Sequence, residues 1–147
     1  MADRRAQLRP HHGNHDGAAA VEFALVSVLL LTLVFGIIQY GLYFWASQIG
    51  SSAVRDAARY SAVGTKDCPD LQATVDDQIS GAAVGSPTTT RSYSANPATT
   101  GGTVTVTVTF QALDIGMPFI PLPGDGEITQ SADARVENVT SSSVDCT

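Results

Sequence analysis

The sequence predicts an α+β membrane protein, in which a long N-terminal transmembrane helix extends out of the bilayer and packs on a small antiparallel sheet. The run from Phe23 to Ala46 holds 24 residues without a charge, and about 20 apolar helical residues cross a hydrocarbon core of about 30 Å. Helical spacing continues beyond this run, and an alternating Val/Thr stretch follows later. We expect four parts: a basic cytoplasmic leader over 1–17, the transmembrane helix over 18–46, its extramembrane continuation over 47–64, and a small α+β domain over 65–147.

Charge predicts the orientation of the chain. Its 147 residues carry a net charge of −6, with three arginines against two acidic residues in 1–17 and five basic against eleven acidic residues in 47–147. Because basic flanks stay in the cytoplasm, we expect a single-pass protein of the inner (plasma) membrane with a cytoplasmic N-terminus and an extracytoplasmic domain. A dense basic face is missing from the sequence, which argues against a nucleic acid partner.

The leader is polar and has no apolar periodicity. His11, His12 and His15 lie together, but metal-binding histidines need a fixed backbone and supporting hydrogen bonds. We therefore expect a solvated leader rather than a metal site, and no cofactor.

One glutamate stands at the threshold of the apolar run, where Gly17 and three alanines lead to Glu22-Phe23. An ionised carboxylate costs about 2.5 to 3.5 kcal/mol at mid-membrane and less near an end, so it needs a partner or neutralisation. The alternative is an interfacial glutamate favoured by the helix macrodipole. The apolar run is too long for a Sec signal peptide and no small-residue cleavage site follows it, so cleavage after the run is not expected.

The spacing of Gly17 and Glu22 is similar to a class III (type IV prepilin) leader, and Glu22-Phe23 is similar to the glutamate-aromatic pair of the Flp/Tad pilins. The resemblance implies that a membrane-embedded prepilin peptidase cuts between Gly17 and Ala18. It also implies that the new α-amino group on Ala18 of a neighbouring subunit meets Glu22.

Beyond the apolar run, Ile49, Ala53, Ala57 and Tyr60 recur at near-helical spacing, which predicts an apolar stripe on a helix that ends near Gly64. Thr32 and Gln39 are polar exceptions within the predicted span, to which we assign no role.

Two stretches of this helix are similar to the TadE-like domain: Phe35-Gly36-Ile37-Ile38-Gln39-Tyr40-Gly41 and Ala53-Val54-Arg55-Asp56-Ala57-Ala58-Arg59-Tyr60. Arg55, Asp56 and Arg59 are the charged residues of this helix motif, with Asp56 where glutamate is usual. The resemblance extends loosely into the C-terminal part. It implies a pilin-like fold, a pseudopilin-like role in Tad/Flp pilus assembly, and pilin subunits and the Tad machinery as partners.

The exported part begins with a predicted short helix that has Pro69 in its first turn and ends near Gly81. Residues 85–102 are expected to be mostly loop, with a strand over 91–95. Alternation predicts strands over 103–111 and 128–137. Because so few strands fold poorly alone, we expect residues 47–64 to cover the sheet. An edge position of the 103–111 strand, open to another chain, is the less favoured alternative.

Cys68 and Cys146 lie on the side where oxidation is permitted. A disulfide between them would close most of the exported domain and contribute about 4 kcal/mol by the chain-entropy estimate. Two unpaired thiols are the alternative, because sequence separation does not determine the distance between Cβ atoms.

The exported part contains no histidine, nucleophile motif or phosphate-binding glycine loop, so we expect no enzyme. One predicted function is a minor pseudopilin-like subunit of a Tad-type pilus assembly or secretion system, processed after Gly17 and acting by helix packing. The other is an unprocessed, single-pass membrane-anchored adhesion or binding domain. Glu22 distinguishes the two, since an anchor has no use for a glutamate there.

Overall fold

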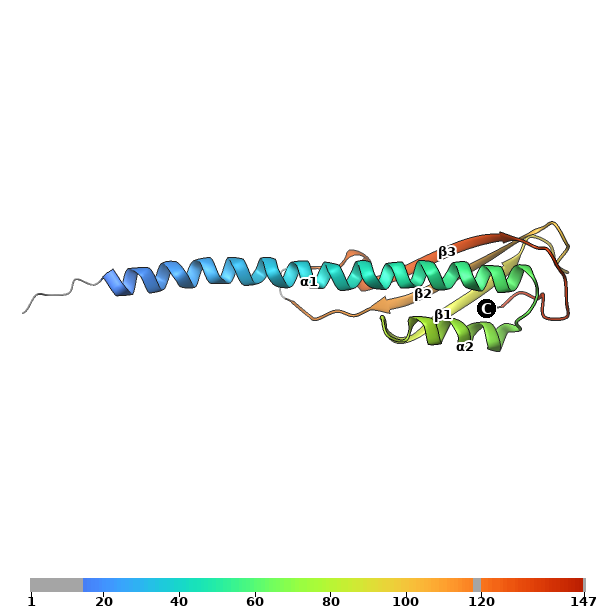
Figure 1. The fold of residues 1–147 in the computed structure, drawn as a ribbon, viewed down its shortest axis with the longest axis horizontal. Coiled ribbons are helices and arrows are strands. Elements are labelled where there is room, and N and C mark those ends of the chain that lie inside the picture. Colours follow the sequence, from blue (N-terminus) through green and yellow to red (C-terminus); the bar gives the residue numbers. More distant parts are fainter. Residues whose placement is uncertain (1–14, 118–119, 147) are drawn as a thin grey trace, which may run out of the picture. The chain divides into compact units, whose positions relative to one another are not determined.

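The structure is a computed structural model that describes residues 15–117 and 120–146 (Figure 1). The chain divides into two compact units, one ending at Phe35 and the other starting at Gly36. The predicted leader lies outside the described residues up to residue 14. The elements in chain order are α1 (His15–Ala62), α2 (Cys68–Ile79), β1 (Ala83–Tyr93), β2 (Thr103–Ala112), the 3₁₀ turn η1 (Pro123–Gly126) and β3 (Glu127–Arg135).

A glycine cap ends α1, close to where the sequence predicts it. Gly64 has φ of +64°, its N–H donates to the carbonyl of Ser61, and the Thr65 N–H donates to the carbonyl of Tyr60. This is the Schellman arrangement, which satisfies the last carbonyls of a helix and favours glycine at the left-handed position. The chain then turns directly into α2.

The short helix α2 forms as predicted. Asp67 caps its N-terminus by accepting the N–H of Asp70 at 2.9 Å, and Pro69 occupies the first turn, where its missing N–H costs nothing. Leu71, Val75 and Ile79 fall on one face of the helix and are all buried. One apolar stripe therefore attaches this helix to the sheet.

The sheet has three antiparallel strands in the order β1-β2-β3. The predicted alternating strands are confirmed as β2 and β3, and β2 is central, so the alternative in which it forms an open edge is wrong. The loop predicted for residues 85–90 is also wrong, because β1 begins at Ala83. This edge strand contains Pro87 and a register shift between Val84 and Thr88, irregularities that sheet edges tolerate and that hide a strand pattern.

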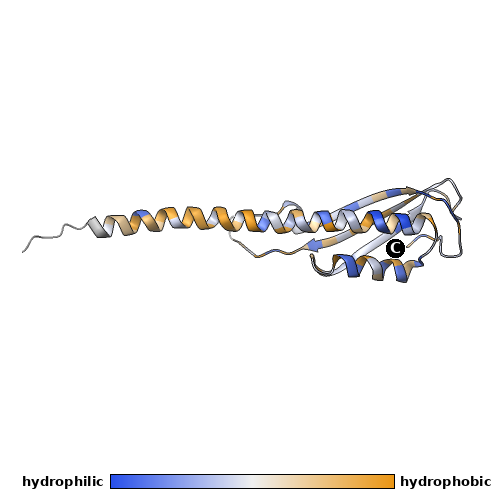
Figure 2. Cartoon of the chain, in the orientation of Figure 1, coloured by the Kyte–Doolittle hydropathy of each residue, from blue (hydrophilic) through white to orange (hydrophobic). Residues whose placement is uncertain are grey.

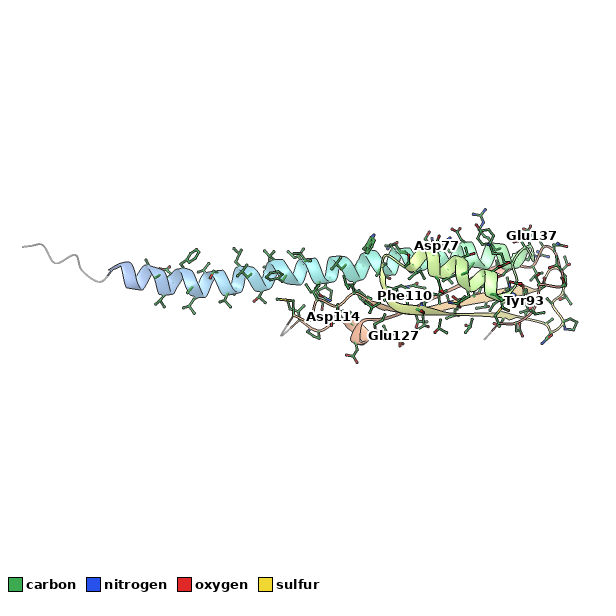
Figure 3. All side chains as sticks on the ribbon, turned by 90° about the horizontal axis from the view of Figure 1, so that it is seen from below. Asp77, Tyr93, Phe110, Asp114, Glu127 and Glu137 are labelled. Carbon is green, nitrogen blue, oxygen red and sulfur yellow. A yellow bond between two sulfur atoms is a disulfide. The ribbon has the colours of Figure 1, made fainter. Side chains whose placement is uncertain are left out.

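Both helices cover the same face of the sheet. The inward residues of β2, Val104, Val106, Val108 and Phe110, share one buried cluster with apolar residues of α1 and α2. Figure 3 draws the side chains, with Phe110 labelled between α1 and the sheet and Glu127 pointing away from the ribbon. On the outer face, hydroxyl-containing pairs link β2 to β3: Thr105 with Asp133, Thr107 with Ser131, and Thr109 with Thr129.

The expectation that residues 47–64 cover the sheet is confirmed. Ala53 and Ala57 are buried as predicted, and Val54 and Ala58 form a second buried row beside them. Tyr60 is the exception: it is 37% exposed, and the next residue, Ser61, is buried instead. The buried residues of α1 are spaced four apart, so Ser61 rather than Tyr60 follows Ala57 on the face that contacts the sheet.

Gly50 lies directly against the Phe110 side chain of the sheet. A Cβ atom there would stand 2.6 Å from Cε1 of Phe110. We expect Gly50→Ala to lower the free energy of unfolding by about 1 kcal/mol, because overpacking costs about 1 to 3 kcal/mol and exceeds the gain of about 1 kcal/mol in helix propensity. Gly41→Ala is the matched control, since its Cβ would meet nothing within 4 Å.

A double-mutant cycle with Phe110→Leu tests whether contact with the Phe110 ring causes the loss of stability in Gly50→Ala. The cost of Gly50→Ala should shrink when the ring is absent, whereas strict additivity would show that the clash with Phe110 is not responsible.

Candidate functional site

The first half of α1 presents apolar side chains to its surroundings. Phe23 is 74% exposed, and Leu25 and Leu29 are each about 70% exposed. The helix from Gly17 to Ala62 contains an 18-residue window of mean hydropathy 2.6 that has no buried residue, visible as the orange stretch in Figure 2. By length and composition this helix can cross a membrane, which supports membrane anchoring.

The predicted processing and assembly residues lie on this exposed stretch. Gly17, Ala18, Glu22 and Phe23 are all helical and exposed, and a Cβ atom at Gly17 would meet nothing within 4 Å. Ala18 and Glu22 are four residues apart and so share one helix face. Within the described part of the chain, the Glu22 carboxylate has no ion-pair or hydrogen-bond partner.

The structure gives no side-chain description of the three histidines of the predicted leader. His11 and His12 lie outside the described residues, and His15 begins α1 with its side chain undescribed. Across residues 15–117 and 120–146, no group of three His, Cys, Asp or Glu side chains could hold a metal ion.

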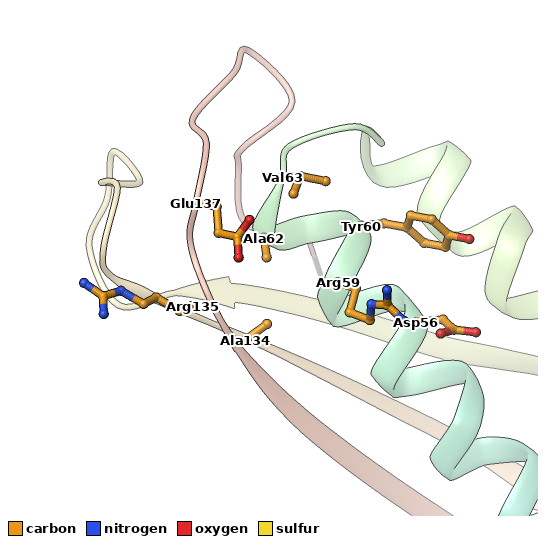
Figure 4. Close-up of a pocket in the computed structure, with 8 residues that line it drawn as sticks. All are labelled: Asp56, Arg59, Tyr60, Ala62, Val63, Ala134, Arg135 and Glu137. Atoms are coloured by element: carbon orange, nitrogen blue, oxygen red, sulfur yellow. The ribbon is translucent and has the colours of Figure 1, made fainter.

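The helix motif divides between two faces of α1. Ala53 and Ala57 pack on the sheet, while Arg55 and Arg59 are exposed and Asp56 is half-buried. A cleft of about 490 Å³ lies beside the last turns of α1, where β3 ends. It is lined by Asp56, Arg59, Tyr60, Ala62, Val63, Ala134, Arg135 and Glu137 (Figure 4). The structure thus brings two of the three charged motif residues to this cleft and leaves Arg55 out.

Charges of both signs alternate around this cleft. Asp56 and Arg59 come from α1, and Arg135 and Glu137 come from the end of β3 (Figure 4). None of these four side chains forms an ion pair or side-chain hydrogen bond with another described residue. The cleft therefore presents two acidic and two basic side chains beside the end of α1.

Gln39 and Tyr40, which sequence reasoning left without a role, hold the loop between β2 and η1. The Oε1 atom of fully buried Gln39 accepts the N–H of Ile115 at 3.1 Å, and the Tyr40 hydroxyl donates to the carbonyl of Pro121 at 3.0 Å. The Cδ1 atom of Ile120 comes within 3.5 Å of a Cβ position at Gly36. These residues belong to the Phe35–Gly41 stretch. In the sequence, the one sign of their contact with the loop was the presence of a glutamine and a tyrosine inside an apolar run.

A buried arginine and a disulfide fasten the C-terminal segment. Cys68 and Cys146 are joined in a disulfide across 78 residues of sequence. Arg91, only 1% exposed, donates to the carbonyls of Lys66, Ser142 and Val144 at 2.8 to 3.0 Å. The backbone of Arg91 also pairs with that of Cys146. The two residues of the disulfide and Arg91 therefore form one cluster at the end of the domain.

The fold and the exposed helix together define a class of protein. A long apolar N-terminal helix packs through its C-terminal part on a three-stranded antiparallel sheet, which is a pilin-like α+β arrangement. Residues 17–59 match the family described as TadE-like protein, so the resemblance is confirmed over that stretch, which is less than a third of the chain. The match includes Gly17, Glu22 and the motif residues Arg55 to Arg59, and β1 to β3 lie outside it. Neither a curated protein nor a solved structure matches the chain.

Proposed function

We propose that this chain is a minor pseudopilin-like subunit of a Tad-type pilus assembly or secretion system, processed after Gly17 by a prepilin peptidase. One observation carries the proposal: Glu22 is exposed on an apolar helix, five residues beyond an accessible Gly17, without a partner among the described residues. The TadE-like match begins at Gly17 and supports a role in pilus assembly that is structural rather than catalytic.

Processing supplies the partner that Glu22 needs. Cleavage leaves a free α-amino group on Ala18, which is protonated at neutral pH. In an apolar environment an unpaired carboxylate is costly, and the amine of a neighbouring subunit removes that cost. The exposed apolar side chains between Phe23 and Ile38 then pack against helices of other subunits, and small residues allow close approach.

The charge distribution supports one orientation. Three arginines precede the apolar run and an acidic domain follows it, so the leader stays in the cytoplasm, within reach of a membrane-embedded peptidase, and the domain is exported. The cleft beside Asp56 and Arg59 then faces the extracytoplasmic side, where it is available to other subunits of the machinery.

Glu22→Ala tests the assembly role. We expect normal membrane insertion but at least about tenfold weaker co-purification of a second, differently tagged copy and of co-expressed pilin subunits, since a desolvated charge pair contributes about 1.5 kcal/mol or more. Val21→Ala, at the preceding exposed position, is the matched control. Unchanged co-purification of the Glu22→Ala protein would favour an unprocessed membrane anchor instead.

A further inference from the structure

We propose that the apolar loop, defined as residues 113–117 together with 120–122, lies in the outer interface of the bilayer and forms a second membrane contact beside α1. The occupant of this surface is lipid and not a protein partner. The inference rests on the membrane insertion of α1 that is part of the proposed function.

The loop is held at a defined level of α1. Gln39 binds the N–H of Ile115 and Tyr40 binds the carbonyl of Pro121. Cδ1 of Ile120 lies against Gly36, 3.5 Å from the position that a Cβ atom would take there. Three contacts spread over residues 36–40 therefore attach the loop beside one and a half turns of the helix, all within the unit that starts at Gly36.

That level falls at the edge of the hydrocarbon core. About 20 helical residues cross the core, so counting from Phe23 places its outer boundary near Leu42. At a rise of 1.5 Å per residue, Tyr40 and Gln39 lie about 3 to 4.5 Å from this boundary, and Gly36 lies about 9 Å inside it. The apolar side chain of Ile120, which contacts Gly36, therefore enters the core, while Ile115 and Pro121 are held at its edge. Tyrosine is enriched at such interfaces, where its ring is apolar and its hydroxyl finds a polar partner, and Tyr40 meets both conditions.

The chemistry of the loop suits a water-poor surface. Leu113 is 47% exposed and Ile115 is 40% exposed, whereas Leu122 is buried, so two apolar side chains of the loop face outward while another anchors it. The loop carries one charge, Asp114, whose Oδ1 atom accepts the N–H of Gly116 at 2.8 Å.

Part of the loop backbone is bonded within the protein: the N–H groups of Ile115, Gly116 and Ile120 each have a partner, and Pro121 has no N–H. Bonding of this kind lowers the cost of non-helical backbone near lipid, and the remaining N–H groups can bond water at the interface. The exposed acids Asp125 and Glu127 follow the loop. They limit it to the interface and prevent deeper insertion.

Bromolipid quenching of a single tryptophan tests the inference. Trp45 is the only tryptophan of the chain, so Trp45→Phe provides a background without tryptophan fluorescence. In the full chain, reconstituted in phosphatidylcholine vesicles with some phosphatidylglycerol, we expect Ile115→Trp to be quenched strongly by lipid brominated near the headgroup, and weakly by lipid brominated near the chain end. Val144→Trp is the matched control, because Val144 is a similarly exposed apolar residue (50%) in the C-terminal segment.

A third variant separates failure of the inference from failure of the proposed function. Val28→Trp lies within the apolar run and should be quenched whenever α1 is inserted. Quenching of Val28→Trp, with Ile115→Trp no more quenched than Val144→Trp, overturns the inference and leaves the membrane helix intact. Protection of Ile115→Trp from aqueous acrylamide without bromolipid quenching also overturns it, in favour of a protein partner. Loss of quenching at Val28→Trp contradicts the membrane insertion itself.

Discussion

Replacing Cys68 and Cys146 together by serine is expected to lower the free energy of unfolding of the unit that starts at Gly36 by about 4.5 kcal/mol. The disulfide joins residues 78 apart, and closing a loop of that length removes a corresponding amount of chain entropy from the unfolded state. Among the described residues, the core is one buried cluster from α1, α2, β2 and β3, against which Ala83 and Tyr93 of β1 pack. A loss of this size is therefore a large part of the stability of this unit.

The measurement is denaturant unfolding of the full chain in mild detergent, with and without a reducing agent. The oxidised wild-type protein should lose stability on reduction to about the level of the double serine variant, which should itself be insensitive to the reducing agent. A wild-type protein whose midpoint does not move on reduction would contradict the role assigned to this disulfide.

Arg91→Leu is expected to lower the free energy of unfolding by about 3 kcal/mol or more. The arginine is buried, and its guanidinium donates to three carbonyls, those of Lys66, Ser142 and Val144. Leucine fills part of the volume but leaves these acceptors without a donor, and each unsatisfied buried group costs about 1 to 3 kcal/mol. Arg91→Lys should recover only part of the loss, because an ammonium lacks the planar fork that reaches three acceptors.

Arg55→Leu is the control for Arg91→Leu. Arg55 is exposed on α1, so its replacement should change stability by less than about 0.5 kcal/mol. Equal effects of the two substitutions would refute the stabilising role of the buried guanidinium. Because Arg91 also approaches Sγ of Cys68 at 3.7 Å, its effect should not add simply to that of removing the disulfide.

Most helices and strands could be predicted because the apolar residues of each recur with a single helical or strand period. The 3.6-residue pattern of Leu71, Val75 and Ile79 and the two-residue alternation around Val106 both survive in the structure as buried faces. The N-terminal part of β1 escaped prediction because an edge strand need not alternate, and Gly85, Ser86 and Pro87 are turn residues by composition. Tyr60 was misplaced because helical spacing alone does not show how wide a contact is.

The candidate site residues differ in whether the sequence alone could reveal them. Glu22 and Gly17 were visible in the sequence because a charge at the start of an apolar run is rare and costly. Gln39, Tyr40 and Arg91 were not, because each bonds backbone atoms far away in the sequence. The separations run from 25 residues, between Arg91 and Lys66, to 81 residues, between Tyr40 and Pro121. Such pairings arise from the tertiary fold and leave no local pattern.

The helix α1 thus carries two kinds of surface along one continuous element. From Phe23 to Ile38 its apolar side chains are exposed, whereas Ala46, Ala53 and Ala57 are buried against the sheet. The first surface has no cover within the described part of the chain, and under the proposed function a membrane and the helices of other subunits would cover it. This division explains why an apolar run of 24 residues leads into a stripe of small residues.

The most direct test of the central proposal is the intact mass of the protein purified from otherwise identical hosts with and without a prepilin peptidase. We expect a mature chain that begins at Ala18 only when the peptidase is present, and a chain that retains the leader when it is absent. A chain that retains Met1 or Ala2 in both hosts would contradict processing after Gly17, and with it the assignment of Glu22 to a neighbouring subunit's amine.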